Sequence, residues 1–249
     1  MTMPRGLYAV TPDCDDDDWL LAAVMAAVRG GTSSVQYRHK QAGAAQRLRQ
    51  ARRLAQACRT LGVPLIVNDS AEVALEVAAH GVHLGRDDGD PTAARALLGA
   101  QHLIGVSCYD EFERALRWRG VADYVAFGAV FVSSVKPGAV RAPLALFERA
   151  RREGFGGGST SPSGGPRSDG PRLVAIGGID ATNAAQVAAA GADAIAVISA
   201  VFGDGRGDPG LCETRARRVC EAFRSGRGVA SDSVSAGRQA APGATRAEH

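Results

Sequence analysis

Residues 62–88 read GVPLIVNDSAEVALEVAAHGVHLGRDD, and this stretch contains one complete strand–helix–strand unit. The apolar run 65–67 predicts a strand, and the polar pair Asn68-Asp69 follows it. An alanine-rich pattern with a period near 3.6 residues predicts a helix over 71–79, and a glycine closes it before the next strand at 82–84. The unit favours a fold built from repeated strand–helix pairs.

The same alternation repeats along nearly the whole chain. Apolar runs predict eight strands at 7–10, 34–37, 65–67, 82–84, 103–106, 124–127, 173–176 and 194–197. Helical patterns follow them at 19–29, 45–61, 71–79, 92–98, 111–119, 143–153, 183–190 and 211–224. Eight strands, each followed by a helix, predict a single-domain α/β fold, the (β/α)8 or TIM barrel. The alternative fold, an open doubly wound sheet, commonly carries a GxGxxG turn after its first strand. This chain reads TPDC at that place, which argues against the open sheet.

Two segments fall outside the repeat. Residues 156–170 form a Gly/Ser/Pro-rich insert between the sixth helix and the seventh strand, and residues 226–249 lack periodicity. Both compositions are typical of mobile chain. We therefore expect a barrel over 1–225 and a disordered C-terminal tail over 226–249. Because the insert precedes a strand, we expect it on the N-terminal face of the barrel, away from the chemistry.

Composition argues against several classes of protein. Aromatic residues make up 5% of the chain and the formal net charge is +3, so a nucleic-acid-binding surface is poorly supplied. No apolar run reaches the ~20 residues of a membrane span, and no basic leader precedes an apolar segment. The five cysteines have no CxxC spacing, which fits a reducing compartment. We expect a cytoplasmic protein with small-molecule substrates, no nucleic-acid partner and no membrane partner, and the oligomeric state stays open, a homo-oligomer included.

Only two of the 29 basic residues are lysines, Lys40 and Lys136. Each lies in a polar cluster just past a predicted strand. Lysine offers a compact charge that suits a single phosphate oxygen, whereas arginine presents a planar fork. Because the active sites of (β/α)8 barrels lie at the C-terminal ends of the strands, we predict that both lysines belong to the site.

Polar residues or a glycine turn follow most of the other predicted strands. The candidates, in strand order, are Gln36, Arg38, Lys40, Asn68, Asp69, Asp88, Ser107, Ser133, Lys136, Gly178, Val197, Ile198 and Ser199. Carboxylates are hard oxygen ligands that suit Mg2+ with its retained waters, so Asp69 and Asp88 are candidate metal ligands. The alternative role for an aspartate in a loop between a strand and a helix is that of a helix N-cap, which is about as frequent as a role in metal binding. Two acids together with three cations favour a metal-bound polyphosphate as ligand.

A second phosphate site is predicted at the last two strand ends. The pair Gly177-Gly178 precedes a helical pattern, so backbone N–H groups can approach a ligand closely there. Loops after the seventh and eighth strands of barrels recurrently bind a monophosphate, and Ser199 lies on the adjacent strand end. No Ser/His/Asp relay and no lysine in an apolar strand interior is found, and His83 is interpreted as a packed core histidine.

The motifs now assembled resemble those of the thiamine phosphate synthase family over roughly 7–223. They are QYRHK at 36–40, ND at 68–69, GVHLG with Asp88 at 81–88, GVS at 105–107, the segment 128–136 ending in Lys136, GGI at 177–179 and VISA at 197–200. The resemblance implies Mg2+-dependent coupling of a hydroxymethylpyrimidine diphosphate with a hydroxyethylthiazole phosphate, or its carboxylated form. Diphosphate would leave first, and the thiazole nitrogen would capture the resulting pyrimidine cation.

The resemblance also implies roles for the candidate residues. Asp69 and Asp88 would hold Mg2+. The diphosphate would be bound by Arg38, Lys40, Asn68 and Lys136. Gln36 would lie near the pyrimidine, and Ser107 would contact the leaving group, whereas Gly178 and the strand end 197–199 would bind the thiazole phosphate. Arg38, Lys40, Ser107 and Lys136 form the expected catalytic set, and Ser133 is counted among the substrate-binding residues.

One segment and three single positions depart from the family pattern. The segment PTxTK reads VSSVK at 132–136, and Arg86, His39 and Ser70 replace a glutamine, a glutamate and an acid. None of these changes removes a metal ligand or a diphosphate-binding lysine, so we expect an active enzyme. Two alternatives remain: a TenI-like thiazole tautomerase, which needs a histidine near the fifth strand where 107–109 reads SCY, and a non-catalytic sensor of thiamine phosphate.

Overall fold

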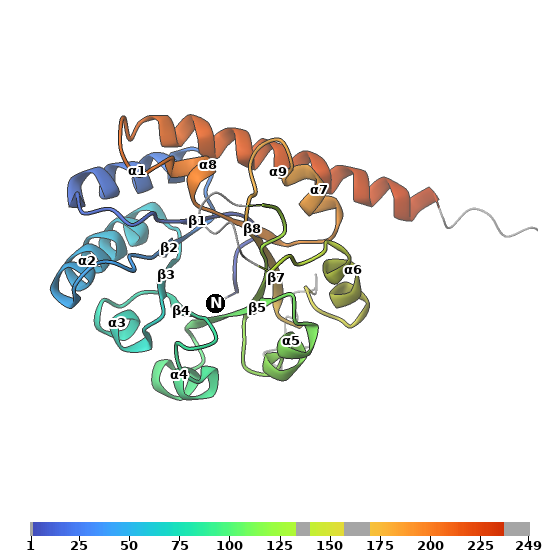
Figure 1. The fold of residues 1–249 in the computed structure, drawn as a ribbon, viewed down its shortest axis with the longest axis horizontal. Coiled ribbons are helices and arrows are strands. Elements are labelled where there is room, and N and C mark those ends of the chain that lie inside the picture. The colour runs from blue at the N-terminus through green and yellow to red at the C-terminus, as the bar shows by residue number, and fades with distance from the viewer. Residues whose placement is uncertain (1, 133–139, 157–169, 237–249) are drawn as a thin grey trace, which may run out of the picture.

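Eight parallel strands form a closed barrel in chain order, with β8 paired to β1 (Figure 1). The structure is a computed structural model that describes residues 2–132, 140–156 and 170–236, with side chains described as far as Arg227. The strands are β1 Gly6–Val10, β2 Ser34–Tyr37, β3 Leu65–Asn68, β4 Gly81–Leu84, β5 Leu103–Tyr109, β6 Tyr124–Gly128, β7 Arg172–Ile176 and β8 Ala194–Val197. The predicted (β/α)8 barrel is confirmed.

The helices form a ring outside the strands. They are α1 Asp17–Arg29, α2 Ala44–Leu61, α3 Ala71–Glu76, α4 Pro91–Leu98, α5 Phe112–Trp118, α6 Ala145–Arg152, α7 Ala184–Ala189, α8 Ser199–Phe202 and α9 Leu211–Ala236. The short α8 follows β8 directly and was not predicted. The helix predicted over 71–79 ends earlier, at Glu76, because Ala78 takes a positive φ of 50° that a helix does not allow.

The last helix is longer than the sequence indicates. Helix α9 runs to Ala236, so the predicted helix end at 224 is wrong, and residues 226–236 are helical rather than disordered tail. Helix α9 packs closely against α7 at Gly226, where a β-carbon would lie 2.0 Å from the carbonyl oxygen of Ala185. At this position the tertiary contact requires glycine despite its weak helical propensity. Figure 1 shows α9 passing along α1, α8 and α7.

Both ends of the predicted insert lie at the start of β7. The backbone N–H of Gly156 donates to Pro171 O over 2.8 Å, and that of Gly170 donates to Gly154 O over 3.2 Å. These residues precede a strand and therefore lie on the N-terminal face of the barrel. Residues 157–169 of the insert and 237–249 of the tail lie outside the described residues.

Apolar side chains fill the barrel on both sides of the sheet. The larger buried cluster lies between strands and helices, and a second one, which includes Tyr8, Tyr124 and Val174, fills the barrel interior. Met3 joins the interior cluster, and the N-terminus lies near the centre of the ring in Figure 1. Met3 thus packs into the barrel at its N-terminal end, opposite to the strand ends where the cavity described below lies. Among the described residues, no helix is long and apolar enough to span a membrane.

Candidate active site

A cavity of about 910 Å³ lies at the C-terminal ends of the strands. Every predicted site residue that the structure describes lines this cavity: Gln36, Arg38, Lys40, Asn68, Asp69, Asp88, Ser107, Gly178, Val197, Ile198 and Ser199. Ser133 and Lys136 lie outside the described residues. Their described neighbours Val132 and Val140 line the same cavity and are strongly exposed there.

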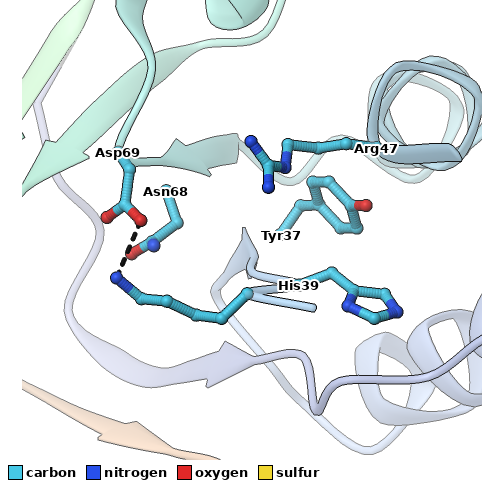
Figure 2. A pocket seen from close by; sticks show the side chains of 6 residues that line it. Tyr37, His39, Arg47, Asn68 and Asp69 are labelled. Carbon is cyan, nitrogen blue, oxygen red and sulfur yellow. Dashed lines mark hydrogen bonds and ion pairs between the residues drawn. The ribbon is translucent and has the colours of Figure 1, made fainter. Parts of the chain in front are cut away.

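The β3 end brings a carboxylate against one of the two lysines. Lys40 Nζ lies 2.8 Å from Asp69 Oδ2, beside a smaller pocket of about 80 Å³ (Figure 2). Asp69 has a positive φ of 70°, a conformation that aspartate tolerates better than most residues. Its backbone N–H donates to the His83 carbonyl on β4 over 2.9 Å, which fixes the turn. The ion pair therefore joins the ends of β2 and β3.

The second carboxylate belongs to the β4 end. Asp88 Oδ2 accepts the backbone N–H of Gly85 over 2.8 Å, and a β-carbon at position 85 would lie 2.6 Å from that oxygen. Burial and the neighbouring Asp69 carboxylate raise the pKa of Asp88. Two carboxylates that face one another create a site where a cation relieves repulsion.

The acid pair suits Mg2+ in a particular way. No group of three or more His, Cys, Asp or Glu side chains that could cage a metal occurs in the described part of the chain. Mg2+ commonly takes only one or two carboxylates and completes its shell with water and substrate phosphate oxygens. Asp69 and Asp88 fit this kind of site, so the residues present are compatible with the metal that the resemblance implies.

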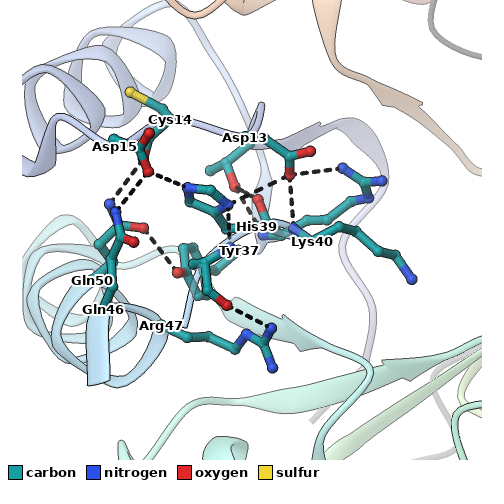
Figure 3. A network of polar contacts seen from close by, with 12 residues as sticks. Asp13, Cys14, Asp15, Tyr37, His39, Lys40, Gln46, Arg47 and Gln50 are labelled. Atoms are coloured by element: carbon teal, nitrogen blue, oxygen red, sulfur yellow. Dashed lines mark hydrogen bonds and ion pairs between the residues drawn. The ribbon is translucent and has the colours of Figure 1, made fainter. Parts of the chain in front are cut away.

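The loop after β1 holds the loop after β2. Asp13 Oδ1 accepts the backbone N–H of Lys40 over 2.8 Å and lies 3.1 Å from Arg38 Nη1 (Figure 3). Thr11 Oγ1 accepts the Arg38 N–H over 2.8 Å and donates to the Arg38 carbonyl over 2.9 Å. Sequence reasoning missed both Thr11 and Asp13, although the polar TPD run directly after the first strand is a signal that could have found them.

The residues that depart from the family pattern have structural partners. His39 Nδ1 accepts the Ala42 N–H over 3.0 Å, and Nε2 lies 3.3 Å from Asp15 (Figure 3). The ring therefore lies between the loop that precedes α1 and the loop that precedes α2. Arg86 forms an ion pair with Glu111. Ser70 Oγ accepts the N–H of Val73 and caps α3.

Hydrogen-bonded side chains form the floor of the cavity. Tyr8 Oη, on β1, lies 2.8 Å from Tyr124 Oη on β6 and accepts from Gln36 Nε2 over 2.8 Å. His83 Nδ1 lies 3.1 Å from Tyr124 Oη, and its Nε2 lies 2.8 Å from Ser107 Oγ. Burial lowers the pKa of His83 to about 4. His83 is buried, as predicted for a packed core histidine, and its ring also contacts the predicted site residue Ser107.

Backbone groups dominate the other side of the mouth. Gly177 and Gly178 have positive φ values of 100° and 65°, and a β-carbon at Gly178 would lie 2.3 Å from Val132 O. Ser199 is the first residue of α8, where N–H groups have no partner within the helix. Because β3 and β7 lie four strands apart in a ring of eight, this side faces the Lys40–Asp69 pair across the cavity.

The fold and this cavity define the class of protein. A closed (β/α)8 barrel whose strand ends carry an acid pair, cationic side chains and a glycine turn around one cavity has the architecture of the (β/α)8-barrel enzymes. A family model described as thiamine monophosphate synthase matches residues 7–201. The chain belongs to this family, and it is a transferase.

Individual relatives agree with this assignment. The thiamine-phosphate synthase of Aromatoleum aromaticum is 54% identical over 202 residues, which cover 81% of this chain and 90% of the relative. That of Methylococcus capsulatus is 47% identical over 224 residues, or 90% and 91% of the two chains. The structure of thiamine phosphate pyrophosphorylase from Pyrococcus furiosus has a TM-score of 0.70 at 28% identity and covers 89% of this chain and 96% of that one. These names favour the synthase over the tautomerase and the sensor.

Proposed function

We propose that the enzyme couples a hydroxymethylpyrimidine diphosphate to a hydroxyethylthiazole phosphate, or its carboxylated form, and releases diphosphate in a Mg2+-dependent reaction. The observation that carries this proposal is the division of one cavity into two anion-binding sides. Arg38, Lys40 and the acid pair lie on one side, and Gly178 with Ser199 lies on the other. Two phosphorylated substrates can therefore meet over the floor between them.

Charge distribution suggests how the residues promote the reaction. Arg38 and Lys40 would hold the diphosphate and stabilise the negative charge that grows as the C–O bond breaks. Asp69 and Asp88 would hold Mg2+, which when bound would neutralise part of the same charge. Ser107 would donate a hydrogen bond to the leaving group. These interactions strengthen in the transition state, so they raise the rate rather than only the affinity.

The rest of the cavity would protect and orient the reactants. Apolar side chains of Ala126, Val174 and Ile176 line it, and they would limit the access of water to the pyrimidine cation. The thiazole phosphate, bound at Gly178 and Ser199, would bring the thiazole nitrogen to the cation, and such positioning can contribute several kcal/mol. The mechanism needs no protein nucleophile. The five cysteines are free thiols, which supports the predicted cytoplasmic location.

Diphosphate release by the purified protein tests the proposal. Release should require both substrates and Mg2+, and Asp88→Asn should lower kcat about 100-fold, the usual loss for one electrostatic contact to the transition state. Asp87→Asn is the matched control, because Asp87 is exposed and does not line the cavity. Release without Mg2+, or equal losses in the two variants, would contradict the metal role. No release with either thiazole substrate would contradict the reaction itself.

A further inference from the structure

Five side chains form one continuous hydrogen-bonded chain across the barrel interior. It begins at Gln36 on β2, passes through Tyr8 on β1, Tyr124 on β6 and His83 on β4, and ends at Ser107 on β5. The four contacts measure 2.8, 2.8, 3.1 and 2.8 Å. Both ends line the cavity, so the chain joins two site residues by a path beneath it.

Four of the five members of this chain are buried and neutral. Tyr8 and Tyr124 are at most 1% exposed, and Gln36 and His83 are below 10%. Burial raises the pKa of both tyrosines and lowers that of His83, so none of them ionises near neutral pH. Of the charged groups near His83, Asp88 raises this pKa and Lys40 lowers it. The chain therefore acts through the direction of its hydrogen bonds and not through a change of charge.

Ring packing fixes the geometry of the chain. The ring of His83 stacks on that of Tyr124 at 5.6 Å with an interplanar angle of 19°, and Tyr8 meets Tyr124 edge-on at 5.8 Å. Gly105 leaves the space that the Tyr124 ring occupies, because a β-carbon there would lie 2.0 Å from it. The hydroxyl groups consequently have few alternative partners, which makes the direction of donation uniform along the chain.

Counting hydrogens gives that direction. The amide nitrogen of Gln36 can only donate, so Tyr8 Oη accepts from it and its own hydrogen goes to Tyr124. Tyr124 then donates to His83 Nδ1, which leaves the ring hydrogen on Nε2. His83 Nε2–H donates to Ser107 Oγ, and the Ser107 hydrogen is left free to point into the cavity.

We infer that Tyr8, Tyr124 and His83 are positioning residues whose hydrogen bonds transmit the orientation of the Gln36 amide to Ser107 and hold the Ser107 hydroxyl as a donor toward the cavity. Its acceptor there, an oxygen of the leaving diphosphate, rests on the proposed function. Reversing the chain would turn Ser107 into a donor to His83. The leaving group would then lose a hydrogen bond that was oriented before the reaction.

The tautomer of His83 is a readout that does not depend on activity. In 15N-histidine-labelled protein, NMR at pH 8 should show the His83 hydrogen on Nε2, with the signal assigned by its absence in His83→Gln. Gln36→Glu replaces the donor by a carboxylate that can only accept when ionised, so the whole chain should reverse and the hydrogen should move to Nδ1. In a Tyr8→Phe background the same substitution should leave the tautomer unchanged, because the path is cut.

Kinetics test the consequence for Ser107. Tyr124→Phe should lower kcat about 10-fold with KM nearly unchanged, since it weakens a donor to the leaving group without removing a binding contact. Combined with Ser107→Ala it should cost no more than Ser107→Ala alone, because both act on one hydrogen bond. Tyr37→Phe is the matched control: this buried tyrosine bonds to Gln50 over 2.9 Å outside the chain, so kcat and the His83 tautomer should not change.

Two results would overturn the inference. One is a wild-type His83 that carries its hydrogen on Nδ1, or a tautomer that Gln36→Glu leaves in place. The other is full additivity of Tyr124→Phe and Ser107→Ala. Failure of the proposed function looks different, because the tautomer results would stand while no combination of substrates released diphosphate.

Discussion

Gly105 shows how one missing side chain shapes the floor of the site. A β-carbon at this position would lie 2.0 Å from Tyr124 Cζ and 2.2 Å from its Oη, and real contacts of this kind are never so short. Gly105 is directly paired with Tyr124 across the β5–β6 ladder. The glycine is thus required by space, since its backbone conformation is one that any residue adopts.

Gly105→Ala should therefore destabilise the protein and displace the Tyr124 ring. Overpacking a buried site costs about 1–3 kcal/mol, and this neighbour is a ring held on two sides. Urea unfolding followed by circular dichroism measures the free energy of unfolding. Gly120→Ala is the matched control, because a β-carbon there meets nothing within 4 Å. Equal effects of the two substitutions would show that the contact with Tyr124 does not limit residue 105.

His80 should make stability depend on pH. Its Nδ1 accepts the N–H of Leu65 over 3.0 Å, and burial first, then Arg59 and His102, lower its pKa from the ordinary 6.5. As the pH falls below 6.5, the unfolded chain takes up the proton before the folded chain does, so folding stability decreases. Urea unfolding at pH 7.5 and pH 5 should show a smaller decrease for His80→Asn than for the wild type. An unchanged decrease would mean that His80 does not contribute.

At the scale of elements, the strands were predictable because their apolar runs are short and bounded by turn residues. All eight lie where the pattern puts them, with small differences at the ends. The four-residue α8 was missed, since one helical turn is too short to show a 3.6-residue period. The end of α9 was missed because residues 225–236, which are rich in glycine and serine, show no apolar period of 3.6 residues.

The candidate site was predictable to the extent that it follows strand ends. Residues such as Arg38, Asp69 and Asp88 lie one to four positions past the ends of predicted strands, so the barrel rule places them at one mouth. Tyr8 and Tyr124 lie inside strands that are 116 positions apart, and the sequence does not say which interior side chains meet. Their contact depends on barrel closure and on the space left at Gly105, which only the three-dimensional structure provides.

Gly226 gives a prediction about how α9 packs. In an exposed helix, alanine is favoured over glycine by about 1 kcal/mol, so Gly226→Ala would normally stabilise the protein. Here the new β-carbon would lie 2.0 Å from the Ala185 carbonyl oxygen, and we expect a net loss of about 1–2 kcal/mol. Thermal unfolding of Gly226→Ala and of Ser225→Ala, an exposed neighbour, provides the comparison. A stabilised Gly226→Ala would contradict the close contact between α9 and α7.

At the scale of the whole molecule, one buried carboxylate helps close the barrel at its N-terminal end. Asp193 directly precedes β8, is fully buried and accepts the Leu173 N–H of β7 over 3.0 Å. Arg5, before β1, approaches its carboxylate to 3.1 Å, and Arg151 of α6 approaches it to 2.8 Å. Asp123 repeats the arrangement before β6, with Ile104 and Arg95 as partners. The Asp193 carboxylate thus links the last strand to the first and to the helix layer.

Asp193→Asn should lower the stability of the whole barrel while leaving its chemistry intact. The amide can still accept the Leu173 N–H, but the charge that holds Arg5 and Arg151 is lost, and breaking a buried pair costs about 3 kcal/mol. Urea unfolding should show this loss as one cooperative transition, because the linked elements belong to a single barrel. At 20 °C, kcat should stay within about twofold of the wild type, since the cavity opens at the opposite end and removing a distant charge leaves contacts at the reacting atoms unchanged.

The matched control is Glu148→Gln, which also replaces a carboxylate by an amide but at an exposed position, and its free energy of unfolding should equal that of the wild type. A neutral Asp193→Asn would show that the closure depends on the backbone ladder between β8 and β1 alone.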